Sequence, residues 1–377
     1  MLGFALDDDQ RALRDEARRA GGRLTSLAGA GAEGRVNRPL VRALADEGLL
    51  GRLFPAGGEV SSMSLCLLRE GLAMASTEAE TALALQGLGA YPILQSGGPE
   101  IAERWIPRVA AGEAVAAFAL TEPAHGSDAA ALELRAERVE GGWRLDGEKA
   151  FISNAPEADV YTVFARTTPG AGSRGVTAFC VPGDGDGLAG EPVELLAPHA
   201  IGNLRFDGVT VPDDHVIGEV DAGFRVAMAT LDLFRPSVGA FAVGMAAAAL
   251  EQALDHAGER TSMGKPLREH QAISQLLGEM ATRTEAARLL VYAAASAHGR
   301  GERVTRISAM AKLFATETAQ LVVDGAVQVL GARALERGHP LEHLYREVRA
   351  PRIYEGTSEI QREIIARELY RDRTSSC

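Results

Sequence analysis

The sequence predicts an α+β multidomain fold with an α, β, α order along its 377 residues. Two observations predict this order. Long helical patterns occupy both ends of the chain, and short alternating runs bounded by glycine and proline lie between them. A chain of this length is also too long for one small hydrophobic core, so more than one structural unit is expected. We expect an N-terminal α-helical domain at 1–113, a middle β domain at 114–221 and a C-terminal four-helix-bundle-like domain at 222–377.

The N-terminal segment carries a charged helix start and an apolar stripe. Asp7 to Asp9 begin the first pattern, in which Leu13 and Ala17 recur on one face among arginines. Further helices are expected at Pro39–Glu47, Ser64–Ser76, Glu78–Leu88 and Pro99–Ala110. The segment therefore predicts a helical domain.

The pattern changes near Ala114, where short strands replace helices. Gly141 and Gly142 lie between two alternating runs and predict a hairpin. Strands are expected at Ala114–Leu120, Leu132–Val139, Val160–Thr167, Val176–Val181 and Asn203–Val211. Together they predict a compact central antiparallel β domain, a small barrel or sandwich.

Long helical patterns return after Gly223. Met280, Thr284 and Ala287 recur at the spacing that a bundle core needs. Helices are expected at Phe224–Leu233, Ser237–Gly258, His270–Ala297, Thr305–Leu330, Leu341–Arg346 and Ser358–Tyr370.

Charge and cysteine content limit the kinds of partner and site that the sequence predicts. The net charge of −12 argues against non-specific binding to nucleic acid or to an anionic membrane, so a small molecule is the expected partner. Cys66, Cys180 and Cys377 are odd in number, far apart and without metal-ligand spacing, so neither a disulfide framework nor a metal site is expected. The N-terminus lacks a signal-peptide pattern, and a cytoplasmic protein is expected.

One stretch combines a carboxylate with a helix entrance. In Ile353–Arg362, Gly356 permits a sharp backbone approach, and Thr357 or Ser358 can cap the following helix. The free amides of such an entrance suit a polyanion such as a cofactor diphosphate. These residues alone leave two interpretations of Glu355 open, a solvated surface carboxylate or a functional group presented on a rigid turn.

This stretch closely resembles the C-terminal signature of the acyl-CoA dehydrogenases, FAD-dependent enzymes that desaturate acyl thioesters. The resemblance implies that Glu355 is the catalytic base, that Tyr354 and Gly356 contact substrate, and that Thr357 and Glu359 contact FAD. In some members the base lies instead on the helix that here contains Phe234. A phenylalanine at that position leaves Glu355 as the candidate.

Two further segments resemble the flavin-contacting motifs of the family. Leu120 to Asp128 is similar to its Thr-Glu-Pro-Gly-Ala-Gly-Ser-Asp segment, with Ala124-His125 as a departure. Lys149 to Asn154 is similar to Lys-Met-Trp-Ile-Thr-Asn, although by itself it is also an ordinary strand with one aromatic. The resemblance implies flavin contacts from Leu120, Thr121, Gly126, Ser127, Phe151, Ile152 and Ser153, with Ser127 also near substrate.

Two more segments resemble the motifs with which the family reaches the FAD of a neighbouring subunit. One begins at Arg260 and continues to His270-Gln271, with Met263 where the family has phenylalanine. The other contains Gln328 and Gly331, followed by Ala332 where the family has a second glycine. The implied FAD contacts are Arg260, Gln271, Gln328 and Gly331.

Alignment with the family also implies an acyl pocket. Ala90 and Leu94 are expected near the acyl tail, and Phe234 and Arg235 near the reacting carbons. Without the resemblance, the apolar members read as core residues, and a salt bridge at a helix start explains Arg235 equally well.

The resemblance as a whole implies dehydrogenation of an acyl-CoA or another acyl thioester to its trans-2-enoyl product. Glu355 would take the α-proton while the β-hydride passes to flavin N5. An electron-transfer flavoprotein is the expected electron acceptor, and the expected assembly is a homotetramer or homodimer. The alternatives are an acyl-CoA oxidase that uses O2, a dehydrogenase of acyl-carrier-protein thioesters, and a non-catalytic scaffold of the same fold.

Overall fold

The structure is a computed structural model, and it describes residues 6–55, 60–197 and 199–374. The chain forms two compact units, each assembled from separated segments. The helical unit comprises Met1–Arg23, Ser61–Glu80 and Asp232–Cys377, and the sheet unit comprises Leu24–Val60 and Thr81–Leu231. The domain boundaries predicted from the sequence stay a prediction.

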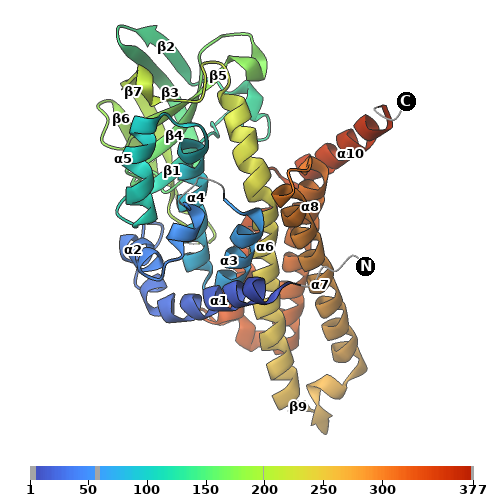
Figure 1. The fold of residues 1–377 in the computed structure, drawn as a ribbon. Helices are drawn as coiled ribbons and strands as arrows, with labels where there is room; N and C mark the ends of the chain where they lie inside the picture. The colour runs from blue at the N-terminus through green and yellow to red at the C-terminus, as the bar shows by residue number, and fades with distance from the viewer. Residues whose placement is uncertain (1–5, 56–59, 198, 375–377) are drawn as a thin grey trace. The chain divides into compact units, whose positions relative to one another are not determined.

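The predicted α, β, α order is confirmed (Figure 1). The α-helices are α1 (Asp8–Ala28), α2 (Arg38–Asp46), α3 (Ser62–Ala73), α4 (Thr77–Ser96), α5 (Pro99–Ala110), α6 (Gly223–Glu259), α7 (Gln271–Gly299), α8 (Thr305–Leu330), α9 (Pro340–Glu347) and α10 (Ser358–Thr374). Strands β1 to β8 lie between α5 and α6 along the chain, and a short β9–β10 hairpin separates α6 from α7.

Helix α6 joins two runs that the sequence presents separately, because the helix continues through Pro236. An interior proline removes one backbone hydrogen bond and costs about 3 kcal/mol. The neighbouring residues Leu233, Phe234 and Val238 are fully or almost fully buried, and burial of such a helix supplies more stability than local propensity does. Tertiary packing therefore overrides the local break.

The core of the helical unit is built from α3, α6, α7 and α8. Cys66, Phe241, Val291 and Val322 belong to one buried cluster of these helices. The three bundle positions expected from the sequence are also buried, namely Met280, Thr284 and Ala287.

The sheet unit contains one eight-stranded sheet among the described residues. Its strands are β1 (Ala116–Ala119), β2 (Arg135–Val139), β3 (Gly142–Ser153), β4 (Val160–Arg166), β5 (Val176–Pro182), β6 (Leu188–Pro192), β7 (Ile201–Pro212) and β8 (Val216–Ile217). The order is β6-β7-β3-β2-β4-β5-β8, with β1 paired to β4. The hairpin predicted at Gly141 and Gly142 joins β2 to β3.

The sheet is antiparallel except at two places. Strand β1 pairs with β4 in parallel, and a single parallel pair joins β2 to β4. Strands β6 and β8 were not expected from the sequence. Strand β6 is mostly exposed and β8 has two residues, so neither has the apolar alternation that marks a half-buried strand.

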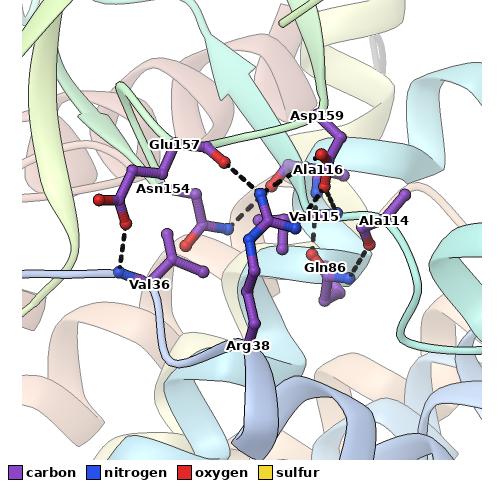
Figure 2. A network of polar contacts seen from close by, with 9 residues as sticks. All are labelled: Val36, Arg38, Gln86, Ala114, Val115, Ala116, Asn154, Glu157 and Asp159. Carbon is purple, nitrogen blue, oxygen red and sulfur yellow. Dashed lines mark hydrogen bonds and ion pairs between the residues drawn. The ribbon is translucent and has the colours of Figure 1, made fainter. Parts of the chain in front are cut away.

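Helix α4 lies directly on β1. A Cβ on Gly89 would meet the backbone nitrogen of Ala117 at 2.5 Å, so only glycine allows this approach. Gln86, one turn earlier, donates to the Ala114 carbonyl at 2.7 Å and accepts from the Ala116 amide at 2.9 Å. Figure 2 shows this amide between Ala114 and Ala116 at the start of β1.

The same network holds the end of β3 (Figure 2). Asn154 donates from its side chain to the Ala116 carbonyl at 2.8 Å. Arg38 binds the Asp159 carboxylate at 2.8 Å, and Asp159 in turn accepts from the Val115 amide at 2.7 Å. The turn that follows β3 is thereby fixed to β1 and to the start of α2.

The structure also describes the cysteines, the side chains that could bind a metal and the most apolar helix. Cys66 and Cys180 are buried free thiols, and Cys377 lies outside the described residues. The described part of the chain holds no group of three metal-ligating side chains. Helix α6 is long and apolar enough to span a bilayer, but 89% of its most apolar window is buried inside the protein, as in the core helix of a globular fold.

Candidate active site

Glu355 and Gly356 form a left-handed turn at the entrance to α10. Their φ angles are 51° and 92°, and the first is uncommon for a residue with a side chain. Thr357 then caps the helix, because its hydroxyl accepts from the Ile360 amide at 3.3 Å. The turn and cap expected from the sequence are therefore present, and they present the Glu355 side chain at a strained backbone position.

Two side chains hold this turn by its carbonyl groups. Gln361 donates to the carbonyls of Glu355 and Gly356 at 3.1 and 3.0 Å. Lys312 on α8 donates to the Gly356 carbonyl at 2.7 Å and is fully buried. The left-handed turn is thus fixed from its own helix and from a neighbouring one.

One oxygen of the Glu355 carboxylate is buried without a hydrogen-bond partner among the described residues. The residue is partly exposed as a whole, but Oε2 is buried and has no partner within the described chain. Burial raises the pKa of Glu355, while Arg69, Lys312 and Arg235 act in the opposite direction. Oε2 is therefore an unsatisfied acceptor that can take a proton.

Arg69 on α3 is the first of these cations. Its guanidinium is almost completely buried, pairs with Glu80 and donates to the Ser237 hydroxyl at 2.7 Å. Arg69 and Glu80 were not expected from the sequence. Arg69 directly follows the apolar run Leu65–Leu68, where a charge at a core position could have signalled a buried ion pair.

Lys312 is the second missed cation. Burial lowers the pKa of Lys312 to about 8, against the opposing charge of Glu355. It follows Ala309 and Ala311 and precedes Ala315 on the buried side of α8, so a lone lysine in an alanine-rich core stripe was the available signal.

Arg235, the third cation, was expected from the sequence. It donates to Asp232 at 3.1 Å, while its Nε is buried without a partner among the described residues. This salt bridge lies inside α6 and not at a helix start, and the charge of Arg235 also acts on Glu355. Its contact with substrate stays a prediction. Phe234 is 2% exposed and precedes it on α6.

In the sheet unit, the Thr121 loop and the end of β3 lie side by side. The Ala150 amide donates to the Thr121 carbonyl at 2.9 Å. Leu120 and Ile152 are buried, Ser153 is half-buried, and Gly126 and Ser127 are exposed. Backbone pairing therefore joins the two segments that resemble the flavin-contacting motifs.

Phe151 supplies the test of whether a flat cofactor fits here. The residue is 57% exposed, and its φ of 54° lies in the left-handed region. A large apolar ring held at the surface by a strained backbone is expected where a ligand covers it. The interpretation of this aromatic as a core residue is wrong, and the residues fit the planar ring system of a flavin.

The remaining expected FAD contacts lie at another part of the helical unit. Arg260, Gln271, Gln328 and Gly331 are all exposed, and the hairpin after Arg260 carries Met263, which is 93% exposed. Gln328 lies sixteen residues beyond Lys312 on α8, or about 24 Å along the helix. Gln328 therefore does not join the Glu355 turn within one chain.

The expected acyl-tail residues lie on α4. Ala90 is fully buried and Leu94 is half-buried, so both fit a core role as well as a pocket role. Their assignment to substrate stays a prediction.

Comparison with known proteins matches the whole length of the chain. The N-terminal, middle and C-terminal domain models of acyl-CoA dehydrogenase match residues 7–113, 117–209 and 221–370. The chain is 36% identical over 348 residues to cyclohexane-1-carbonyl-CoA dehydrogenase of Geobacter metallireducens, which covers 90% of this chain and 91% of that relative.

Solved structures of two proteins are also similar to this chain over nearly its whole length. Butyryl-CoA dehydrogenase from Megasphaera elsdenii has a TM-score of 0.92 at 32% identity, covering 98% of this chain and 100% of that one. A structure of PigA with FAD and proline has a TM-score of 0.92 at 27% identity, covering 98% of this chain and 99% of that one.

These matches identify the protein as a flavin-dependent oxidoreductase. The chain belongs to the acyl-CoA dehydrogenase family, whose members depend on FAD. Its general reaction is the dehydrogenation of an acyl-CoA.

The turn itself can be tested by Gly356→Ala. A Cβ at Gly356 would lie 2.6 Å from Nε2 of Gln361, which is fully buried and cannot move aside freely. We expect the free energy of unfolding to fall by about 1–3 kcal/mol from backbone strain, and by about 1 kcal/mol more for each carbonyl bond lost. Denaturant unfolding measures both.

Gly338→Ala is the matched control. Gly338 has a similar φ of 87° and no atom within 4 Å of an added Cβ, so it reports the backbone strain alone. Equal losses in the two variants would show that Gln361 does not hold the turn.

Proposed function

We propose that Glu355 is the catalytic base of an acyl-CoA dehydrogenase that converts an acyl-CoA to its trans-2-enoyl-CoA. The single observation that carries this proposal is the buried, unpartnered Oε2 of Glu355 among three cations. In this assignment Oε2 takes the α-proton of the thioester. When bound, FAD supplies a two-electron acceptor for the hydride that leaves the β-carbon.

An α-proton of a thioester is a very weak acid, so the developing enolate needs stabilisation while the base acts. The backbone amide of Glu355 has no hydrogen-bond partner within the described residues, and the left-handed turn holds it in place. We assign this amide to the thioester carbonyl oxygen. Base and donor then belong to one residue, and their relative position is set by Lys312 and Gln361.

We also assign residues to the contacts with cofactor and substrate. We assign Phe151 to stacking on the flavin, and the groups of Leu120, Thr121, Ile152 and Ser153 to its edge. The exposed Phe151 ring supports this assignment. Gly126 and Ser127 would contact cofactor or substrate, Thr357 and Glu359 the cofactor at the α10 entrance, and Ala90, Leu94, Phe234, Arg235, Tyr354 and Gly356 the substrate.

Glu355→Gln tests the base. The amide keeps the shape of the side chain and cannot take a proton at neutral pH, so the rate of flavin bleaching by an acyl-CoA should fall at least about 10²-fold. Stopped-flow absorbance across a panel of linear, branched and cyclic acyl-CoA substrates measures this rate and identifies the preferred acyl group.

Glu363→Gln provides the comparison, because Glu363 is an exposed carboxylate about two turns further along α10. We expect that variant to bleach at close to the wild-type rate. Wild-type bleaching by Glu355→Gln with normal FAD content would rule out Glu355 as the base.

The pH dependence of kcat/KM tests the surrounding charges, which are Arg69 on α3, Arg235 on α6 and Lys312 on α8. The base is active when ionised, so activity falls as pH drops through the raised pKa of Glu355. Lys312→Met removes a cation that lowers this pKa, and the acid limb should move to higher pH. Lys312→Arg keeps the charge and should leave the limb near its wild-type position.

An unchanged acid limb in Lys312→Met would contradict the electrostatic role of Lys312. A loss of rate at every pH without a shift of the limb would mean that Lys312 acts only through the Gly356 carbonyl.

We further propose a homotetramer or homodimer in which Arg260, Gln271, Gln328 and Gly331 contact the FAD of a neighbouring subunit. Gln328 lies about 24 Å along α8 from Lys312, which binds the Gly356 carbonyl, and this separation supports the arrangement. An electron-transfer flavoprotein is the proposed acceptor, the cytoplasm the proposed location and fatty acid metabolism the proposed context. Rapid reaction of the reduced enzyme with O2 in the stopped-flow assay would favour an oxidase instead.

Arg260→Ala tests the contact with the neighbouring subunit. An arginine fork on the diphosphate contributes a charge-assisted hydrogen bond, so FAD affinity should fall about tenfold or more. Arg268→Ala, which removes another exposed arginine near the same hairpin, should bind FAD normally. Sedimentation velocity gives the assembly, and a monomer that retains full FAD affinity would overturn the proposal.

A further inference from the structure

The sheet unit contains a buried ion pair that the reaction does not use. Lys149 on β3 is fully buried, and its Nζ donates to the Glu122 carboxylate at 2.8 Å and to the Leu120 carbonyl at 2.9 Å. Buried ion pairs often contribute little net stability, because desolvation offsets their attraction. A pair in such a position therefore calls for another explanation.

Glu122 extends the contact to a third segment of chain. Its two carboxylate oxygens accept from the amides of Glu133 at 2.6 Å and Leu134 at 2.9 Å. Together with the Ala150 to Thr121 backbone bond, these contacts join the start of the Thr121 loop, the start of β2 and the middle of β3. Every polar atom of the Glu122 carboxylate is engaged in this junction.

Arg166 on β4 fixes the intervening segment. It donates to the carbonyls of Ala130 and Leu132 at 2.7 and 2.9 Å. The loop tip at Gly126 and Ser127 stays exposed while both of its ends are held. The loop is therefore anchored by two cations and is open only at its tip.

The opposite end of the Phe151 segment is anchored as well. Asn154 donates to the Ala116 carbonyl, as Figure 2 shows, and Lys149 holds the other end two residues before Phe151. A residue such as Phe151 keeps a left-handed φ only where its surroundings over-determine the backbone. Lys149 and Asn154 hold the chain on either side of Phe151, and the Phe151 amide itself donates to Asn203 Oδ1 at 3.2 Å.

From these contacts, and resting on the proposed function, we propose that the Lys149–Glu122 pair is a positioning device for the cofactor. It sets the Thr121 backbone against the Phe151 ring, so that the loop edge and the stacking surface meet one planar ligand together. Neither side chain touches the reacting atoms. Removing the pair should weaken FAD binding more than it weakens the fold.

Two kinds of variant separate positioning from simple stability. Lys149→Met alone leaves a buried carboxylate without its counter-ion, which should destabilise the apoprotein and weaken FAD binding together. The double variant Glu122→Met with Lys149→Met removes both charges and keeps similar volumes. Its apoprotein should regain most of the lost thermal stability, while the Leu120 carbonyl and the amides of Glu133 and Leu134 still lack partners.

The experiment titrates each apoprotein with FAD and follows quenching of flavin fluorescence and the visible circular dichroism of the bound flavin. For the double variant we expect FAD affinity about tenfold or more below wild type and an altered flavin spectrum. The matched control removes the exposed pair Arg205 and Asp207 on β7 in the same way, and it should change neither quantity.

Wild-type affinity and spectrum in the double variant would overturn the proposal and leave the pair a purely structural element. If the double variant does not fold, Glu122→Gln carries the same test, since its amide cannot accept from both the Glu133 and Leu134 amides; wild-type FAD affinity there also overturns it. Failure of the wild-type protein itself to bind FAD would instead contradict the proposed function.

Discussion

The charge of one partly buried carboxylate, Glu355, depends on how the helices of the helical unit pack. Glu355 Oε2 is enclosed without a hydrogen bond, and an isolated buried carboxylate would simply bind a proton and lose its value as a base. Arg69, Lys312 and Arg235 oppose that protonation. The three cations come from α3, α8 and α6, so the ionisation of one side chain depends on how three helices pack.

Each of these cations is held by partners of its own, so the charge around Glu355 depends on further residues. Arg69 pairs with Glu80 and Ser237, Arg235 with Asp232, and Lys312 with the Gly356 carbonyl. Each partner lies on a different helix or turn from the cation, or one turn away on the same helix. A substitution at Glu80 or Ser237 is therefore expected to act on Glu355 through Arg69, although neither residue belongs to the signature that contains the base.

The sequence predicted the elements and the signature well, because both are local. Periodicity located most helices and strands, and the Gly356 and Thr357 pattern located the cap. What it did not predict depends on contacts between distant segments: the parallel β1–β4 pair and the role of Lys312. Pro236 marks the opposite case, in which a local rule was overridden by burial on α6.

Lys149 in the sheet unit and Lys312 in the helical unit hold the backbone in the same way. Each is fully buried, and each donates to a backbone carbonyl, Leu120 or Gly356, beside a proposed site residue. Burial lowers the pKa of both to about 8. Between about pH 8 and 10.5 the unfolded chain therefore binds more protons than the folded chain. The cost of burying these two ammonium groups is full at neutral pH and is lost as pH rises through that window.

A methionine at either position would avoid that cost, since an apolar replacement of a buried charge is often neutral or stabilising when its partner is replaced too. What methionine cannot do is donate to a carbonyl. An ammonium group offers three donors on a flexible stem and can satisfy a carbonyl and a carboxylate from one buried point, where the planar fork of arginine requires a wider space. Lysine at both positions is therefore best explained by the need to hold a backbone carbonyl in place, with the charge as an accompanying cost that Glu122 and Glu355 reduce.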